Sequence, residues 1–428
     1  MKPCMEIQRP LRRSGQVPIR GGATVKDLVR ELFPQMIRRV HDILPIMVET
    51  SQDLYDNPEM SFEEAYACDY LTGLLRRYGF VVQAGIAGME TAFEARLSWG
   101  KGGPTVAIVA EYDALPEVGH ACGHNLYAAT SVGAALALSD YLRCHDAGPG
   151  GEIRLIGTPA EEKGGGKCIM AEKGVFDELD AVLGIHPAEV SGVGGGSLAL
   201  SQYFVCFSGR AVHAADSPER GINALDAVIA TFNNVNALRQ HVRDDARIHG
   251  VILHGGASAN MVPDYAEAEF LVRSADEAYQ AELVERFKCC AEGAAMASGA
   301  KLELKQVRIP YQATKTNAVL QDLLCECYEY VGEPIESPPS KVSGSSGVGN
   351  MSQVVPTVQG EFSLGSEDVS LHTREFARLA GADNEAYLAR AAAVLSTAVL
   401  CCFMDHEILL RAWQDFHNTL EVMRGGMS

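Results

Sequence analysis

Cys122-Gly123-His124 places a thiol and an imidazole on one tight turn. Both groups bind zinc-like divalent ions, and a thiolate favours the softer metals. Gly123 has no Cβ that could crowd a bound ion. For a single cysteine the commoner state is a buried, inert thiol, so the turn marks a metal site only if other segments supply more ligands.

Two adjacent carboxylates, Glu161 and Glu162, follow an apolar run at 152–156 and the turn at 158–160. One can hold a metal ion while the other takes a proton from water that the ion activates. The alternative is a solvated acidic turn, which is the commoner role of such a pair standing alone. His186 and His372 are single histidines, which alone would also fit ordinary structural positions.

The elements that must position these residues are short apolar runs at 104–110, 152–156 and 181–185, with helical stretches at 128–143 and 168–173 between them. This pattern predicts an α/β fold with a mostly parallel sheet and helices on both faces. The runs lead into 111–124, into Glu161-Glu162 and into His186, respectively. Because ligands bind beyond the carboxyl ends of strands in such sheets, three segments point to one site.

Helical patterning at 25–55 and a capping-box pattern at 61–64, which would open a helix ending at Gly79, are interpreted as scaffold. The stretch 202–312 predicts an inserted domain, because strand, helix, two strands, helix and strand follow one another in a ferredoxin-like order. The catalytic domain then comprises 1–201 and 313–428. Its second part has a helix at 317–331, a glycine-serine loop at 343–349 and a strand at 360–364.

The composition, 47% hydrophobic and 21% charged over 428 residues, suits a globular protein with more than one core. A net charge of -19 disfavours nucleic acid and anionic membranes as partners and favours a small-molecule substrate. Residues 1–20 lack the apolar core of a signal peptide, and 391–404 is too short to span a bilayer and predicts a buried C-terminal helix. We therefore expect a cytoplasmic protein.

The twelve cysteines are scattered without regular spacing, so most are expected to be reduced. Cys289-Cys290 and Cys401-Cys402 lie in helix-like apolar segments and are expected to be buried free thiols. Of all the cysteines, Cys122 has the neighbours that suggest chemistry.

Ordered motifs from about Ser51 to His372 resemble the aminoacylase and carboxypeptidase-like metallopeptidase family. The likeness is to its amidohydrolase branch, which includes hippurate hydrolases, indole-acetyl-amino-acid hydrolases, p-aminobenzoyl-glutamate hydrolase and β-alanyl dipeptidases. The matching motifs are Glu111-Tyr-Asp-Ala-Leu-Pro116, Gly119-His-Ala-Cys-Gly-His-Asn125, Gly157-Thr-Pro-Ala-Glu-Glu162 with Gly164-Gly-Gly-Lys167, Gly184-Ile-His-Pro187, His213 with Gly221-Ile-Asn-Ala-Leu-Asp226, Asn260-Met-Val-Pro-Asp264 and His372-Thr-Arg-Glu-Phe376.

The resemblance implies one or two divalent ions per subunit, Mn or Zn, with Glu161 as the general base. Asp113 would orient a ligand from behind, a role that a metal-bound histidine commonly requires, although a turn aspartate at a strand end is the alternative. The implied ligands are Cys122, His124, Glu162, His186 and His372.

In such enzymes the inserted domain forms a lid and commonly a dimer interface, so the resemblance implies a homodimer. His213 would reach a substrate oxygen, sometimes in the partner's active site. Asn260 and Arg273 would receive a substrate carboxylate, for which a guanidinium fork is suited. The alternatives are a packed strand-end histidine, a turn asparagine and a solvated arginine.

The implied reaction is hydrolysis of a C–N bond by metal-activated water, in an N-acyl amino acid or a dipeptide-like amide. Three positions depart from the family: Asn125 replaces a frequent Asp, Tyr127 a frequent His, and Gly347 a frequent Asp. The change at Gly347 leaves open an aminohydrolase that releases ammonia from an activated aromatic amine, as a nitroanthranilate-type enzyme does. A catalytically silent binding protein on the same scaffold is the alternative of another class, against which the intact Glu161 argues.

Overall fold

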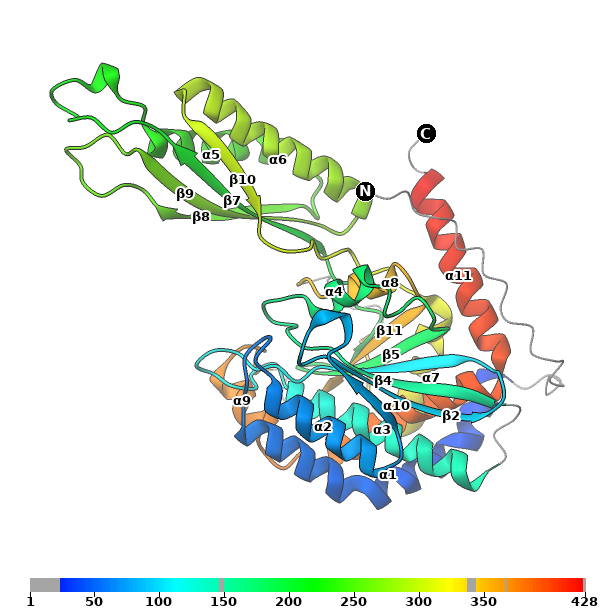
Figure 1. Ribbon diagram of the computed structural model, residues 1–428. Helices are drawn as coiled ribbons and strands as arrows, with labels where there is room; N and C mark the ends of the chain where they lie inside the picture. The colour runs from blue at the N-terminus through cyan, green and yellow to red at the C-terminus, as the bar shows by residue number, and fades with distance from the viewer. Residues whose placement is uncertain (1–23, 146–149, 337–343, 366–367, 426–428) are drawn as a thin grey trace. The chain divides into compact units, whose positions relative to one another are not determined.

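The computed structural model describes residues 24–145, 150–336, 344–365 and 368–425 (Figure 1). The chain divides into two compact units, the first spanning 1–195, 315–341 and 351–428 and the second spanning 196–314 and 342–350. The boundary expected at 202 falls inside a strand, Ala199–Ser208, and the second unit also takes a short segment near 345.

The first unit is built on a seven-stranded sheet with the order β1-β2-β4-β3-β5-β11-β6. Its strands are β1 (Val81–Ala84), β2 (Phe93–Gly100), β3 (Thr105–Ala110), β4 (Gly150–Gly157), β5 (Ala181–Ala188), β6 (Gly192–Val193) and β11 (Thr357–Ser363). The pairs β3–β4, β3–β5 and β5–β11 are parallel, and the pairs β1–β2, β2–β4 and β6–β11 are antiparallel. The sheet is therefore mixed: its four neighbouring strands β4, β3, β5 and β11 are parallel, as expected, and the antiparallel pairs lie on either side of them.

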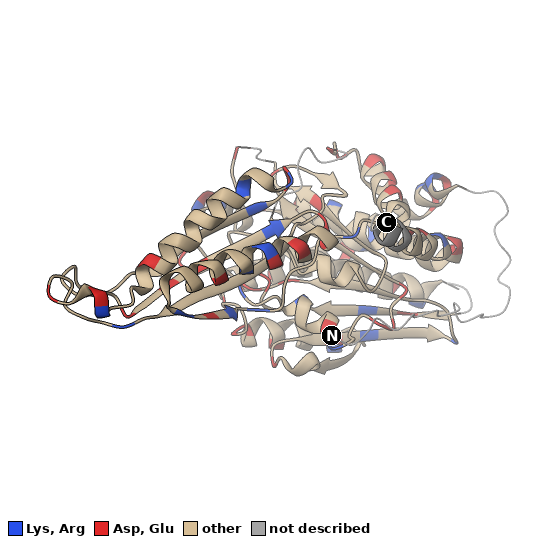
Figure 2. Cartoon of the chain, turned by 90° about the horizontal axis from the view of Figure 1, so that it is seen from above, with Lys and Arg blue, Asp and Glu red and all other residues tan. Residues whose placement is uncertain are grey.

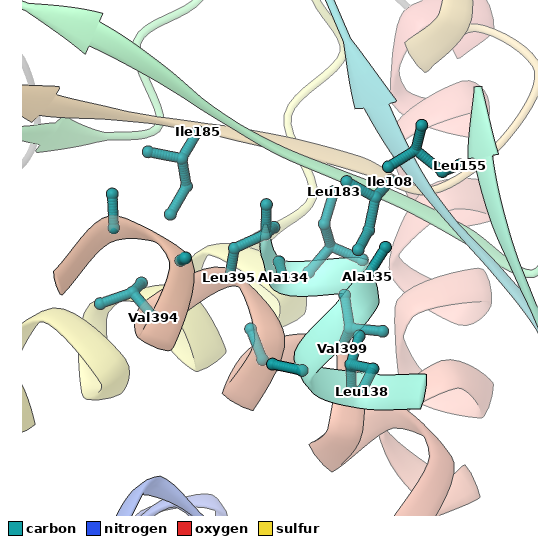
Figure 3. Close-up of a cluster of buried hydrophobic side chains, with 14 of the residues drawn as sticks. Ile108, Ala134, Ala135, Leu138, Leu155, Leu183, Ile185, Val394, Leu395 and Val399 are labelled. Atoms are coloured by element: carbon teal, nitrogen blue, oxygen red, sulfur yellow. The ribbon is translucent and has the colours of Figure 1, made fainter. Parts of the chain in front are cut away.

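Long helices cover one face of this sheet. A single apolar cluster joins alternate strand residues with side chains of α1 (Val25–Asp56), α2 (Ala65–Arg77), α3 (His124–Cys144), α7 (Ala318–Val331) and α10 (Glu385–Met404). Figure 3 shows Ile108 and Leu183 from the strands beside Ala135 of α3 and Val399 of α10. The intervening strand residues, such as Val109 and Val182, are also buried, so the sheet is covered on both faces.

The apolar segment near the C-terminus lies in α10, as a buried helix. By length and composition α10 could cross a membrane, but 89% of its most apolar window is buried within the unit, which accounts for that composition. It is not the last helix, because α11 (His406–Gly425) follows. Shorter helices are α4 (Gly166–Glu172), α8 (Val348–Ser352) and α9 (Arg374–Ala380).

The second unit is a four-stranded antiparallel sheet with the order β10-β7-β9-β8. Along the chain β7 (Ala199–Ser208), α5 (Ala224–Leu238), β8 (Arg247–His254), β9 (Tyr265–Ser274), α6 (Glu277–Ser298) and β10 (Lys301–Gln306) follow one another. Burial alternates residue by residue along β9, and its inward side chains, such as Phe270, pack with Val228 of α5 and Phe287 of α6. This alternation is what one helix-covered face requires.

Acidic and basic positions are interspersed along the helices in Figure 2, within a chain whose formal net charge is -19.

Candidate metal centre

The turn with Cys122 and His124 connects β3 to α3, whose first residue is His124. Gly123 has a left-handed φ of 76°, and an added Cβ would lie 2.9 Å from the Cβ of Pro187. Gly123 is therefore needed for the turn and for clearance from Pro187.

Asp113 orients His124 by accepting hydrogen bonds from its Nδ1. The Nδ1 of His124 lies 2.9 Å from the carbonyl oxygen of Asp113 and 3.1 Å from its Oδ1. Because a carbonyl oxygen only accepts, Nδ1 carries a hydrogen, so Nε2 is the ring nitrogen that can face a metal. The Oδ2 of Asp113 accepts from the hydroxyl of Ser61 and from the backbone N–H of Glu162. Burial alone would raise the pKa of Asp113, but these hydrogen bonds, led by the one from His124, hold it below its ordinary value.

Cys122 and His186 complete a first group of donors with His124. The Sγ of Cys122 lies 3.6 Å from Nε2 of His186, whose Nδ1 donates to the carbonyl oxygen of Pro187 at 2.6 Å. One ligand atom from each of the three residues lies within 4.8 Å of the others. Burial lowers the pKa of His186 to about 4, so this imidazole is neutral and its Nε2 is available to a metal.

A second group comprises Cys122, Glu162 and His372, again within 4.8 Å. The Nε2 of His372 lies 3.6 Å from Oε2 of Glu162. His372 has a positive φ of 65°, and its backbone N–H donates to the carbonyl oxygen of Ala121. Cys122 belongs to both groups, so its sulfur is positioned to serve two ions.

Glu161 lies in a third group with Glu111 and His124. Burial, and then the negative charge of Glu111, raise the pKa of Glu161 to about 7. Ala160, directly before it, has a positive φ of 57°, and its backbone N–H is held by Oε1 of Glu64 at 2.8 Å. The chain thus presents a carboxylate suited to taking and returning a proton near neutral pH.

The segment 61–64, predicted as a capping box, has another role. The N-cap of α2 is Glu64, with no side-chain cap hydrogen bond, so the prediction is wrong in this detail. Ser61 instead donates to Asp113, and Glu64 binds Ala160 and the hydroxyl of Thr91. Both residues support the centre through contacts distant in sequence, and no local signal in the sequence indicated this.

The donor atoms fit a divalent cation. Oε2 of Glu111, Nε2 of His124 and Oε1 of Glu162 are buried without a hydrogen-bond partner among the described residues. Although burial opposes it, contacts with Cys122, Asp113 and Glu111 raise the pKa of His124 well above its ordinary value, because these neighbours favour a positive charge on its ring. Thiolate, imidazole and carboxylate form a donor set that zinc or manganese accepts.

The second unit carries His213, Asn260 and Arg273. His213 is exposed and pairs with Met261 in a short bridge, while the N–H of Ala214 donates to the carbonyl oxygen of Asn260, so His213 and Asn260 are neighbours. Arg273 lies at the other end of β9, about 27 Å from its start at the usual rise per residue. Its Nη1 donates to Ser345, and its buried Nε has no hydrogen-bond partner in the described part of the chain.

Two departures from the family pattern have structural reasons. The Nδ2 of Asn125 faces three acceptors, including the carbonyl oxygens of Ser51 and Ala380, and an aspartate could not donate to them. Tyr127 donates to Oε1 of Gln359 and packs edge-to-face against His186, with ring centroids 5.5 Å apart.

The sequence matches the pattern of peptidase family M20/M25/M40 over residues 107–400. It is 33% identical to the Xaa-Arg dipeptidase of Mus musculus, over 87% of this chain and 89% of that protein, and 31% identical to the Homo sapiens counterpart, over 96% and 98%. It is also 33% identical to one of the subunits of p-aminobenzoyl-glutamate hydrolase from Escherichia coli, over 67% of this chain and 62% of that protein.

Solved structures share the fold. An aminohydrolase described from Staphylococcus aureus has a TM-score of 0.72 and 22% identity, covering 86% of this chain and 98% of that one. A Bacillus subtilis protein described as a dinuclear metal-binding peptidase has a TM-score of 0.64 and 21% identity, covering 84% and 99%.

Proposed function

The chain belongs to peptidase family M20/M25/M40, and from that membership we propose that it hydrolyses the amide bond of an N-acyl amino acid or a dipeptide-like substrate. It is a metal-dependent hydrolase of C–N bonds. The observation that carries the proposal is that metal-binding donors and a proton acceptor are separate residues of one cluster. Two groups of donor atoms share Cys122, and a neighbouring glutamate, Glu161, has a pKa near neutrality.

The proposed ligands are Cys122, His124 and His186 for one ion and Cys122, Glu162 and His372 for a second, with Zn or Mn as the metal. When bound, the metal would lower the pKa of a water molecule and polarise the substrate carbonyl. Glu161 would accept a proton from water and return it to the leaving nitrogen. Asp113 keeps His124 in the tautomer that leaves Nε2 free.

We propose Arg273 as the residue that receives the substrate carboxylate. Its guanidinium has a neutral partner, Ser345, and a buried Nε that is unpaired among the described residues, so part of its donor fork remains available. An arginine fork matches a carboxylate in geometry and charge. N-acyl amino acids and dipeptides both carry such a carboxylate beside the scissile amide.

The test is turnover of purified protein, with zinc and manganese supplied separately, on N-acyl amino acids, dipeptides and aromatic amines. We expect release of free amino acid from one of the first two groups. Release of ammonia from an aromatic amine would replace the proposal with deamination. No turnover of any compound by protein with verified metal content would indicate a binding protein.

We also propose that the protein is a homodimer assembled through the second unit. Strand β8 lies at the edge of its sheet, and three consecutive side chains on it, Val251, Ile252 and Leu253, are 41–53% exposed. An exposed apolar edge strand is a template for pairing with another chain, and a second copy offers the same edge.

We expect light scattering at micromolar concentration to give the mass of a dimer, and Val251→Lys to shift the population toward monomer. Ile229→Lys on α5, at a residue that is 43% exposed, is the matched control for an added surface charge. Monomer at all concentrations of the wild-type protein would contradict the proposal.

His213 is proposed to act on the substrate of the second copy. Within the second unit, Ala199 of β7 faces Ser274 of β9, and Ala199 lies close to the chain connection at 195–196. His213 and Asn260 lie at the opposite end of β9. Mixing inactive His213→Ala and Glu161→Gln chains should then restore activity in heterodimers. Absence of recovery after verified subunit exchange would show that each chain uses its own His213.

A further inference from the structure

The metal centre is bordered by a buried ion pair that the ligand set described above does not include. Glu111 directly follows β3, and Lys167 lies in the first turn of α4. The side chains are each 1% exposed, and Nζ of Lys167 lies 2.6 Å from Oε1 of Glu111. Burying two charges is costly unless each is fully compensated, so the contacts of the second carboxylate oxygen decide what the pair does.

That second oxygen, Oε2 of Glu111, faces the histidines of the first donor group. It lies 3.0 Å from Nε2 of His124 and 3.8 Å from Nε2 of His186. Neither Oε2 of Glu111 nor Nε2 of His124 has a hydrogen-bond partner among the residues that the structure describes, although they lie this close together. Two ligand atoms about 2.1 Å from one ion in tetrahedral or octahedral geometry are roughly 3.0–3.4 Å apart. The separation between Oε2 of Glu111 and Nε2 of His124 therefore matches that of two ligands around a common cation, and the separation from Nε2 of His186 is a few tenths of an ångström longer than that range.

We propose that Glu111 is a further ligand of the metal centre, and that Lys167 holds it in place by binding its other oxygen. The inference rests on the metal centre of the proposed function and extends its ligand set. Because Lys167 occupies Oε1, one oxygen of Glu111 is left to the ion. The lysine also makes the pair neutral, so Glu111 adds a donor without adding net negative charge to the buried site.

An ion pair that does not bind the metal can be distinguished from the proposed ligand by how much metal stabilises each variant. If Glu111 binds the ion, then removing Lys167 leaves a buried carboxylate whose charge the metal alone balances. Metal should therefore stabilise Lys167→Met more than it stabilises the wild-type protein. Removing the carboxylate with Glu111→Gln should have the opposite effect, because a ligand is lost. A structural pair predicts no such opposite changes.

The experiment compares the wild-type protein, Glu111→Gln, Lys167→Met and the double variant. Glu94→Gln is the matched control, since Glu94 pairs with Arg154 at 3.1 Å and both side chains are less than 10% exposed. Zinc and manganese affinity are measured by competition with a chelator. Thermal unfolding of each protein is measured without metal and at saturating metal.

We expect Glu111→Gln to weaken metal affinity by about 10–100-fold and to reduce the metal-induced rise in Tm. Lys167→Met should unfold at a lower temperature without metal and show a larger metal-induced rise. The double variant should regain stability relative to either single variant but keep the weak affinity. The double variant buries neither charge of the pair, so it can test the proposal even if a single variant fails to fold. Glu94→Gln should leave affinity unchanged.

Wild-type affinity in both Glu111→Gln and the double variant would overturn the proposal, as would a metal-induced rise in Lys167→Met no larger than in Glu94→Gln. These outcomes would leave the metal centre itself intact. If the wild-type protein bound neither zinc nor manganese, the proposed function would fail as well, so the two failures are distinguishable.

Discussion

Glu161→Gln is expected to lower turnover by about two or more orders of magnitude while metal content stays near that of the wild-type protein. The amide is nearly isosteric with the carboxylate but cannot take a proton. Glu161 is absent from both proposed ligand sets that contain Cys122, so the donors remain in place. Elemental analysis and steady-state kinetics on the same preparation test both parts of this expectation.

Glu162→Gln is the control, because Glu162 is proposed to bind metal whereas Glu161 is proposed to be the general base. Oε2 of Glu162 faces His372, and its Oε1 is buried without a hydrogen-bond partner among the described residues. Loss of this anionic oxygen should weaken metal affinity, so activity should recover in part with excess zinc or manganese. Equal metal loss in the two variants, or strong metal rescue of Glu161→Gln, would show that the base is assigned wrongly.

The part of the fold that the sequence predicts well is the part with unbroken apolar runs. The segments at 104–110, 152–156 and 181–185 are β3, β4 and β5. Strands β1 and β2 were missed because β2 carries charges within the strand. Glu94 is buried there, and its carboxylate pairs with Arg96 and with Arg154 of β4. Pairing across a sheet makes such charges tolerable, but the partner is invisible in a single strand.

The centre could be predicted as far as its residues lie near or beyond the carboxyl ends of strands: His186 lies near the end of β5, and the turn with Cys122 follows β3. Parallel strands β3 and β5 end at the same edge, and for this reason Cys122 and His186 meet. The supporting residues were not predictable in this way. Ser61 reaches Asp113 across 52 positions and Glu64 reaches Ala160 across 96, and neither contact has a local pattern.

Backbone strain also marks the centre in a way that sequence does not. Five described residues other than glycine have positive φ, and two of them, Ala160 and His372, adjoin or form the proposed site. Such conformations cost about 1–3 kcal/mol each and persist where surrounding contacts enforce them. The hydrogen bonds from Ala160 to Glu64 and from His372 to Ala121 are such contacts. They fix the directions in which Glu161 and His372 present their side chains.

Cys122→Ala should reduce binding of both ions, whereas His186→Ala and His372→Ala should each reduce binding of one. The reason is that Cys122 is the residue shared by the two donor groups, while each histidine belongs to one. A thiolate that bridges two cations balances charge on both. Among the described residues, no donor other than Cys122 belongs to both of these groups.

The measurement is zinc titration with a chelating indicator, which gives the number of ions bound and their affinities. We expect two ions in the wild-type protein, one tight ion in each histidine variant, and weakened binding at both positions in Cys122→Ala.

Turnover of Cys122→Ala at micromolar metal should fall by about 100-fold or more. Stability without metal should change little, because burial raises the pKa of Cys122 to about 12, so in the metal-free protein it is a neutral thiol that alanine replaces with a small loss of volume. Retention of one tightly bound ion in Cys122→Ala would mean that the sulfur serves a single metal, and the second group would then have to bind its ion through Glu162 and His372 alone.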